Sequence, residues 1–286
     1  MIGVKTEGVL YHYTSHETLY HIVEGRSLRA SHAYYMNDAS EIKYAIDIFL
    51  DLVEEFASKS NDPIDKEFLR QLPSLLTRMK NNPHFIFSFS LSEKGNLLSQ
   101  WRAYTPHGTG VSIGMNKNDI KAYALSNGLR LLKCIYDYDE QKSLLSGVLQ
   151  QVISIFQNDK NTIDTSKSPK GQEYHSYMNQ FTEQLLREFI RIKDPAFHEE
   201  CEWRLVSKFY EKYTHPDINF RVGSTTLVPY INYDISRIRS DGELFEQVYC
   251  GPSPNFTLAF SAIRAYLSKS NACKMLINSQ QPYRVV

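Results

Sequence analysis

The sequence predicts an α+β fold in a single domain over residues 1–286. Short apolar segments with strand-like alternation recur along the whole chain. Two helical stretches, at about 39–82 and 139–192, interrupt them, and no convincing linker or internal repeat separates the parts. Hydrophobic residues make up 42% of the chain and charged residues 22%, which is enough apolar material to bury a substantial core. We therefore expect a central β-sheet that carries the two helical stretches as insertions.

The chain opens with a predicted strand, helix and strand. Residues 9–13 form an apolar and aromatic run that is typical of a strand. Thr14 and Glu17 then have the spacing of a capping box, which predicts a short helix that ends at Gly25. A second strand is expected at 28–31.

The middle of the chain alternates between helices and strands. A cap-like pair, Asp38 and Glu41, predicts a long helix to about residue 56, and a second helix covers about 64–79. The clearest strand is 84–91, because its side chains alternate sharply between Phe and Ser. The further expected elements are a helical turn at 97–103, strands at 111–115 and 131–136, two helices within 139–192, strands at 203–209, 220–222 and 227–231, and a closing strand–helix–strand unit at 245–250, 258–267 and 274–277.

The charge balance and the cysteines exclude several classes of protein. Basic and acidic residues both number 32, which argues against a protein that holds nucleic acid mainly by bulk charge and leaves a local basic groove open. No apolar run is long enough for a signal peptide or a membrane span, so we expect a cytoplasmic protein with no membrane partner. Four scattered cysteines predict neither a zinc ribbon nor a disulfide framework, and we expect no metal site.

Polar side chains share one face of three predicted strands, with bulky apolar side chains on the other face. Such a pattern suits a half-buried sheet with a cleft, although the pattern alone more often means a sheet whose polar face simply meets solvent. The polar sets are His12 with Thr14, Ser88 with Ser90 and Ser92, and Glu200 with Glu202 and Arg204.

Two further clusters favour a functional site. The carboxylates at 199–202 are crowded, and such runs serve a cation, a sugar hydroxyl or a proton transfer when they are not simply solvated. The segment 100–104 combines polar and aromatic residues. Its Arg102 has the chemistry to bind a phosphate through two hydrogen bonds, or to pair with one of the acids.

Several blocks in order resemble a bacterial family of unknown function. The resemblance covers nearly the whole chain. The blocks are LYHYTS at 10–15, MND at 36–38, FSFS at 87–90, LSQWRAY at 98–104, GVSIG at 110–114, ECEWR at 200–204, with EWRLV at 202–206, GP at 251–252 and PYR at 282–284.

A more distant resemblance carries chemistry. A His-Tyr-Thr strand, a short helix that ends in Gly and a Leu-led strand are similar to the opening of ADP-ribosyltransferases, including DNA-targeting toxins. This resemblance implies a split β-sheet whose cleft binds NAD as a substrate, with a nucleic acid or a protein as the acceptor. It implies that His12 binds the NAD ribose region, that Ser88 and Ser90 lie on the middle strand, and that Glu202 or Glu200 serves the nicotinamide ribose.

The same resemblance implies the other NAD contacts. Tyr34, Tyr35 and Tyr104 are candidates to stack on nicotinamide, and Arg204 would clamp a pyrophosphate or neutralise the glutamates. The expected NAD-binding set is His12, Tyr13, Thr14, Ser88, Ser90, Arg102, Tyr104 and Arg204.

Three functions follow as hypotheses. The first is an NAD-dependent ADP-ribosyltransferase or NAD glycohydrolase, acting as a toxin or an anti-phage effector, with Glu202, Glu200 and His12 as its catalytic residues. The second is a non-catalytic module that binds a nucleotide or nucleic acid through residues 101–104. The third is a metal-dependent nuclease that uses Asp38 and Glu41 with Glu202.

Overall fold

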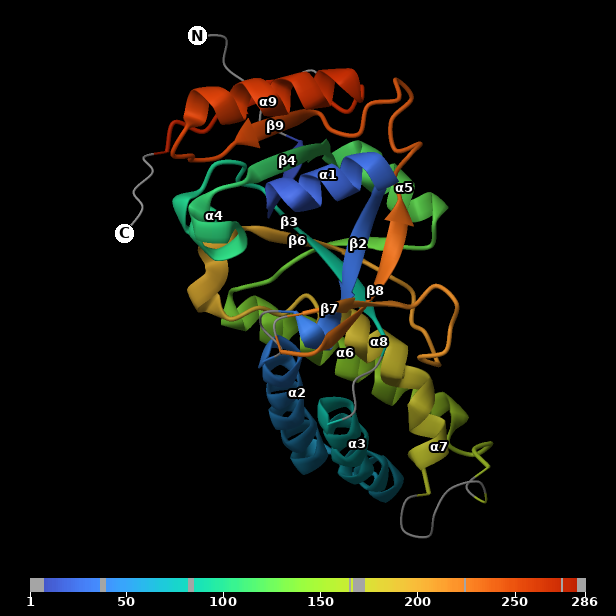
Figure 1. Cartoon of the computed structure of the whole chain (residues 1–286). Coiled ribbons are helices and arrows are strands. Elements are labelled where there is room, and N and C mark those ends of the chain that lie inside the picture. Colours follow the sequence, from blue (N-terminus) through green and yellow to red (C-terminus); the bar gives the residue numbers. More distant parts are fainter. Residues whose placement is uncertain are drawn as a thin grey trace.

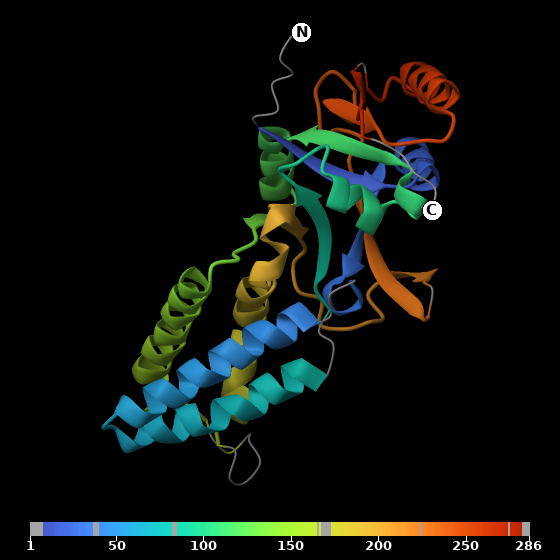
Figure 2. The ribbon, with the colours of Figure 1, turned by 90° about the vertical axis from the view of Figure 1, so that its left-hand side faces the viewer.

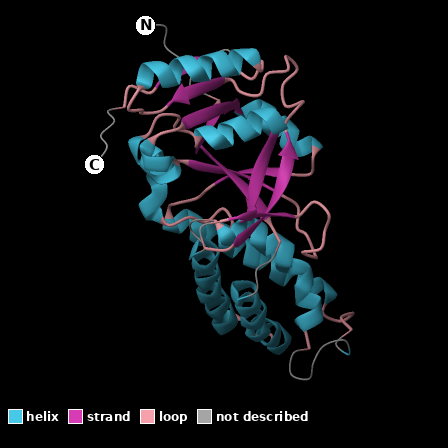
Figure 3. Ribbon diagram, viewed as in Figure 1, coloured by secondary structure: helices cyan, strands magenta, loops and turns pink. Residues whose placement is uncertain are grey.

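The computed structural model describes residues 8–36, 40–81, 85–164, 166, 173–223, 225–273 and 275–281. Within these residues, ten strands form one mixed sheet with helices packed around it, which confirms the α+β fold (Figure 3). No described helix combines the length and apolar character that crossing a bilayer requires. The predicted roles of Asp38 and of the motif at 282–284 lie outside the described residues.

The first three elements are β1 (Val9–Thr14), α1 (His16–Gly25) and β2 (Ser27–His32). The helix cap differs from the prediction. Ser15 caps α1, because its side chain accepts the backbone N–H of Thr18, while Thr14 still belongs to the strand.

The longer remaining elements lie close to the predicted segments, but α5 and the short 3-10 helices were not expected, and the second helical stretch holds α6, α7 and α8 where two helices were expected. The sequence hides α5 because it buries just Ile120 and Ala124, which is too narrow an apolar stripe to show helical periodicity. In chain order these elements are η1 (Ala33–Tyr35), α2 (Ser40–Lys59), α3 (Pro63–Asn81), β3 (Phe87–Ser92), α4 (Leu98–Tyr104), η2 (Pro106–Gly108), β4 (Val111–Asn116), α5 (Lys117–Ser126), β5 (Arg130–Lys133), α6 (Tyr138–Asp159), α7 (His175–Met178), η4 (Asn179–Phe181), α8 (Thr182–Phe189), η5 (Pro195–Glu200), β6 (Glu202–Val206), β7 (Asn219–Val222), β8 (Leu227–Asp234), β9 (Gln247–Cys250), α9 (Phe256–Lys269) and β10 (Leu276–Asn278).

Strand β3 is the junction of the sheet. The strand order is β10-β9-β4-β1-β3-β2-β8-β7, while β6 pairs with β3 and with β5. One edge of β3 pairs with β6 from Ser88 to Ser92. On the opposite edge, β1 pairs only at Ser92 and β2 only at Phe87 and Ser88. The sheet is therefore split between β1 and β2, in front of the middle of β3.

The helical stretches pack together beside the sheet. Figure 1 shows α2, α3, α6 and α8 on one side of the strands, and Figure 2 shows them as a bundle that projects away from the sheet. Their apolar faces share one buried cluster, in which Phe68 and Phe156 stack with ring centres 4.0 Å apart. A second cluster joins the sheet to α1, α5 and α9. The bundle places the N-terminal end of α2 next to β3 and β6.

Trp101 belongs to a third, small core. It packs with Val9, Tyr11 and Tyr13, is fully buried, and its indole N–H donates to Asn96 Oδ1. The prediction that Trp101 contacts a ligand is therefore wrong in this structure, because the side chain fills the core on the inner side of α4.

Candidate functional site

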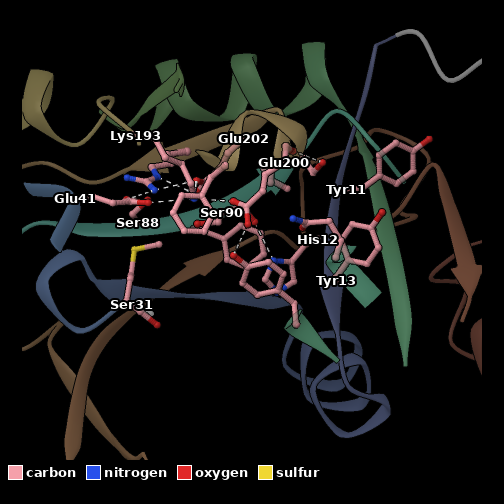
Figure 4. Close-up of a pocket in the computed structure, with 18 of the residues that line it drawn as sticks. Tyr11, His12, Tyr13, Ser31, Glu41, Ser88, Ser90, Lys193, Glu200 and Glu202 are labelled. Carbon is pink, nitrogen blue, oxygen red and sulfur yellow. Dashed lines mark hydrogen bonds and ion pairs between the residues drawn. The ribbon is translucent and has the colours of Figure 1, made fainter. Parts of the chain in front are cut away.

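A pocket of about 470 Å³ opens at the split in the sheet (Figure 4). Its walls come from β1, β2, β3 and β6, with the segments around Tyr35, Tyr104 and Phe197 at its rim. The predicted site residues that line it are His12, Tyr13, Ser88, Ser90, Tyr104, Glu200, Glu202 and Arg204. Segments that are distant in the sequence thus meet at one cavity.

The register of β3 and β6 explains why the polar side chains share the pocket. Ser90 lies opposite Arg204 and Ser92 lies opposite Glu202 in the antiparallel ladder. Directly opposite residues project to the same face, so the serines, the glutamate and the arginine all face the cavity. Phe87 and Phe89 project to the other face and join the core. The alternation predicted from the sequence for these two strands is confirmed.

His12 reaches the pocket in a different way from the one expected. Tyr11, not His12, lies opposite Ser92, so Tyr11 shares the face of the serines. His12 enters because β1 separates from β3 beyond Tyr11, and its ring fills the gap against Phe89 with ring centres 4.3 Å apart. The imidazole takes the place of the missing strand partner, since Nδ1 lies 2.9 Å from the carbonyl oxygen of Ser90.

That hydrogen bond sets the chemistry of His12. Because the Ser90 carbonyl only accepts, Nδ1 carries the proton and Nε2 holds a free lone pair. Burial lowers the pKa of His12 to about 4, although the bond to Ser90 opposes the shift. The ring is therefore neutral near pH 7 and presents an acceptor to the pocket.

A buried ionic cluster forms another wall of the pocket. Lys193 Nζ lies 3.1 Å from Glu41 Oε1, 2.6 Å from Glu200 Oε2 and 2.7 Å from Glu202 Oε2. Arg204 donates to both oxygens of Glu202 at 2.9 Å and also to Glu41. Three carboxylates face two cations, so the cluster carries one negative charge when all its members are ionised.

Within the cluster, the pKa values of Glu202 and Glu41 shift in opposite directions. Burial alone would raise the pKa of Glu202, but the charge and hydrogen bonds of Arg204, with those of Lys193, lower it to about 2. For Glu41, burial prevails and the pKa is raised in spite of the same two cations. Lys193 has a raised pKa, since the carboxylates outweigh the opposing effect of burial. Glu202 is therefore an ionised, buried carboxylate beside the pocket near pH 7.

Glu200 is the more accessible of the two predicted catalytic glutamates. Its side chain is 15% exposed, against 6% for Glu202. Its Oε1 accepts a hydrogen bond of 2.9 Å from the hydroxyl of Tyr104, whose own ring lies at the rim. Glu200 thus links the rest of the buried cluster to the exposed Tyr104.

Two hydroxyls at the base of the pocket have no protein partner. Ser88 Oγ and Ser90 Oγ are buried and make no hydrogen bond within the described residues. The neighbouring Ser92 differs, because its hydroxyl donates to the carbonyl of Glu200 and accepts from the N–H of Lys94. Buried polar atoms are nearly always paired, so unpaired ones at a pocket indicate a place for a ligand or water.

Three members of the predicted NAD-binding set do not present a free polar group to the pocket. Thr14 and Arg102 do not line the pocket, because Thr14 is buried beside β4 and Arg102 points to solvent from α4. Tyr13 borders the pocket, but its hydroxyl donates to the Lys94 carbonyl and accepts from the N–H of Leu97.

Three charged residues that line the pocket were not expected from the sequence, and a fourth, Glu41, was expected only in the nuclease hypothesis. Lys193 and Glu41 complete the ionic cluster, and Arg29 and Arg221 line the wall beyond β2. Arg29 and Arg221 sit in short alternating strands, which is a weak signal for a site. The nuclease hypothesis names Glu41, whose carboxylate pairs with Arg204 and Lys193. Among the described residues, no group of three potential metal ligands is present.

Comparison with known proteins identifies one relationship. The model of a family described as a protein of unknown function (DUF2971) matches residues 100–205. The matched part contains Tyr104, Lys193, Glu200, Glu202 and Arg204, and it excludes β1, β2 and β3. No curated protein and no solved structure matches the chain. The resemblance to an uncharacterised family is thus supported over this part of the sequence.

Proposed function

We propose that this chain cleaves the bond between nicotinamide and ribose in NAD, and passes the ADP-ribose to a nucleic acid, a protein or water. One observation carries the proposal. A neutral histidine and an ionised, buried glutamate line the same pocket at a split in the sheet. The resemblance to ADP-ribosyltransferases also implies a histidine, a serine and a glutamate in this order along the chain, and His12, Ser90 and Glu202 match that order. Such an activity suits a toxin or an anti-phage effector.

The proposed reaction needs an anion near the ribose. The C1′–N bond breaks, its electron pair leaves with the nicotinamide nitrogen, and the ribose becomes an oxocarbenium-like cation. The carboxylate of Glu202 stabilises this developing positive charge, since its low pKa keeps it ionised. Its Oε1 accepts a single hydrogen bond, from Arg204, and so retains a lone pair for a ribose hydroxyl.

The other pocket groups have complementary roles in the proposal. His12 Nε2 accepts a hydrogen bond from a second ribose hydroxyl, and the hydroxyls of Ser88 and Ser90 hydrogen-bond the substrate at the base of the pocket. Glu200 lies toward the mouth, where it accepts the proton of the attacking water or acceptor group as that group bonds to C1′. Tyr104 positions Glu200 through its hydroxyl.

The alternative is a non-catalytic module that binds a nucleotide. Such a module would bind its ligand in the same pocket and would need no ionised glutamate. Its expected contact residues, Trp101 and Arg102, do not line the pocket. A ligand that binds equally well to the wild type and to Glu202→Gln, with no cleavage in either, would favour this module.

The test is nicotinamide release from NAD, measured with and without added DNA, RNA and protein. We expect Glu202→Gln to lower the rate by roughly a hundredfold or more, as loss of one electrostatic group in an active site does. His12→Ala also lowers the rate. Glu199→Gln is the matched control, because Glu199 is exposed next to Glu200 and lies outside the pocket. Equal release from the wild type and Glu202→Gln, or no release from any protein, would contradict the proposal.

A further inference from the structure

Two arginines line the pocket on the wall opposite His12. Arg29 is in β2 and Arg221 is in β7, and both side chains are exposed. Strand β8 lies between them, with Arg29 opposite Asn232 and Arg221 opposite Val228. This register places both arginines on the face that carries Ser31 and Ser88. They therefore approach the cavity from the same side of the split.

Neither arginine has an acidic partner among the described residues. The guanidinium carbon of Arg29 lies 5.4 Å from the centre of the Tyr230 ring. Every other arginine or lysine that lines the pocket, namely Arg204 and Lys193, is held by glutamates. The arginine wall of β2 and β7 thus offers two free guanidinium groups, which suit oxygen anions that accept two hydrogen bonds at once.

The pocket is therefore polarised. The walls formed by β1 and β6 carry the neutral His12 and the glutamates, which suit sugar hydroxyls, and the wall of β2 and β7 carries free positive charge. The unpaired hydroxyls of Ser88 and Ser90 lie between them, and Ser88 is only 2% exposed. A ligand that matches this pattern has hydroxyls at one end and several negative charges at the other.

We infer that Arg29 and Arg221 bind the diphosphate of the nucleotide substrate and so fix its direction in the pocket. This inference rests on the proposed function for the identity of the substrate, and it adds which wall receives the phosphates. A volume of about 470 Å³ is in the usual range for small-molecule sites. The zero net charge of the chain favours a small nucleotide over a polynucleotide backbone at this wall.

The test is calorimetric binding of ADP, AMP and adenosine to the whole chain. We expect Arg29→Gln and Arg221→Gln each to raise the Kd of ADP roughly tenfold, because each removes a charge-assisted hydrogen bond. The affinity for adenosine stays unchanged, and added salt weakens ADP binding in the wild type. Arg130→Gln is the control, since Arg130 is an exposed strand arginine outside the pocket.

Three outcomes would overturn the inference: no ADP binding by the wild type, equal ADP affinity in the wild type and both variants, or loss in these variants of oligonucleotide binding alone. The ADP-binding result does not depend on whether the chain cleaves NAD. If no protein releases nicotinamide but ADP binding still depends on both arginines, the proposed reaction fails and the diphosphate site stands.

Discussion

The two edges of β3 differ in their strand pairing, and we assign stability to one edge and ligand binding to the other. The edge toward β6 is paired along the strand and carries a closed set of ionic bonds through Glu202 and Arg204. The edge toward β1 and β2 is paired only at its ends. There a histidine ring substitutes for a strand, and two hydroxyls nearby stay unpaired.

A sheet makes room for a ligand where two of its strands separate. A continuous ladder satisfies every backbone group and leaves no space, whereas a split exposes polar groups that a ligand can use. The paired edge holds the charged side chains in place. The split edge supplies the cavity and its unfilled hydrogen bonds. Substitutions on the two edges should therefore act on different properties.

The largest effect is expected from Arg204→Met on the paired edge. This change leaves Glu41 and Glu202 buried with Lys193 as their one remaining cation, and removes the bond from Arg204 to the Ile190 carbonyl. Breaking a buried ionic cluster in this way should lower the free energy of unfolding by about 3–5 kcal/mol. Urea denaturation of the wild type and the variant measures this change in the free energy of unfolding.

The control for this change is Arg102→Met. Arg102 is exposed on α4, so its loss should alter stability by no more than about 0.5 kcal/mol. Equal effects of the two substitutions would show that the cluster does not hold the paired edge.

The two edges should also titrate in different pH windows. The pKa of His12 falls from 6.5 to about 4 on folding, so its contribution to stability is complete above pH 6.5 and is lost as the pH falls toward 4. The pKa of Glu202 falls from 4.5 to about 2, so its contribution is lost between pH 4.5 and 2. Each group changes stability by up to about 1.4 kcal/mol per pH unit.

Unfolding free energy measured against pH checks these windows. His12→Gln should flatten the curve between pH 6.5 and 4 and leave the steeper acid limb. Glu202→Gln should flatten the acid limb instead, whereas Glu41→Gln should not, because burial shifts the pKa of Glu41 upward. Curves of the same shape for wild type and His12→Gln would contradict the neutral, buried histidine at the split.

The faces of single strands were predictable from the sequence. The Phe and Ser alternation in β3 and the spacing of Glu200, Glu202 and Arg204 depend only on the two-residue period of a strand, which is a local property. Both patterns put the right side chains in the pocket.

The missed parts of the site depend on pairing and packing between distant segments. His12 faces the pocket because β1 leaves β3 after Tyr11, and no local pattern shows where two strands separate. Glu41 meets Lys193 because the two helical stretches share one core beside the sheet. Trp101 was misplaced for a similar reason, since a seven-residue helix does not reveal which of its faces is covered.

The smallest effect on stability is expected from Ser88→Ala and Ser90→Ala on the split edge. Their hydroxyls have no partner to lose, so unfolding free energy should change by no more than about 0.5 kcal/mol. Ser92→Ala is the matched change on the same strand. It removes two hydrogen bonds and should lower stability by about 1 kcal/mol.

The proposed function requires that the unpaired hydroxyls of Ser88 and Ser90 bind the substrate. The most direct measurement is the Kd of an NAD analogue whose ribose ring oxygen is replaced by carbon, which binds without being cleaved. We predict that the double variant Ser88→Ala, Ser90→Ala binds it roughly tenfold or more weakly than the wild type while remaining equally stable. An unchanged Kd in this variant, or no binding by the wild type, would contradict the account.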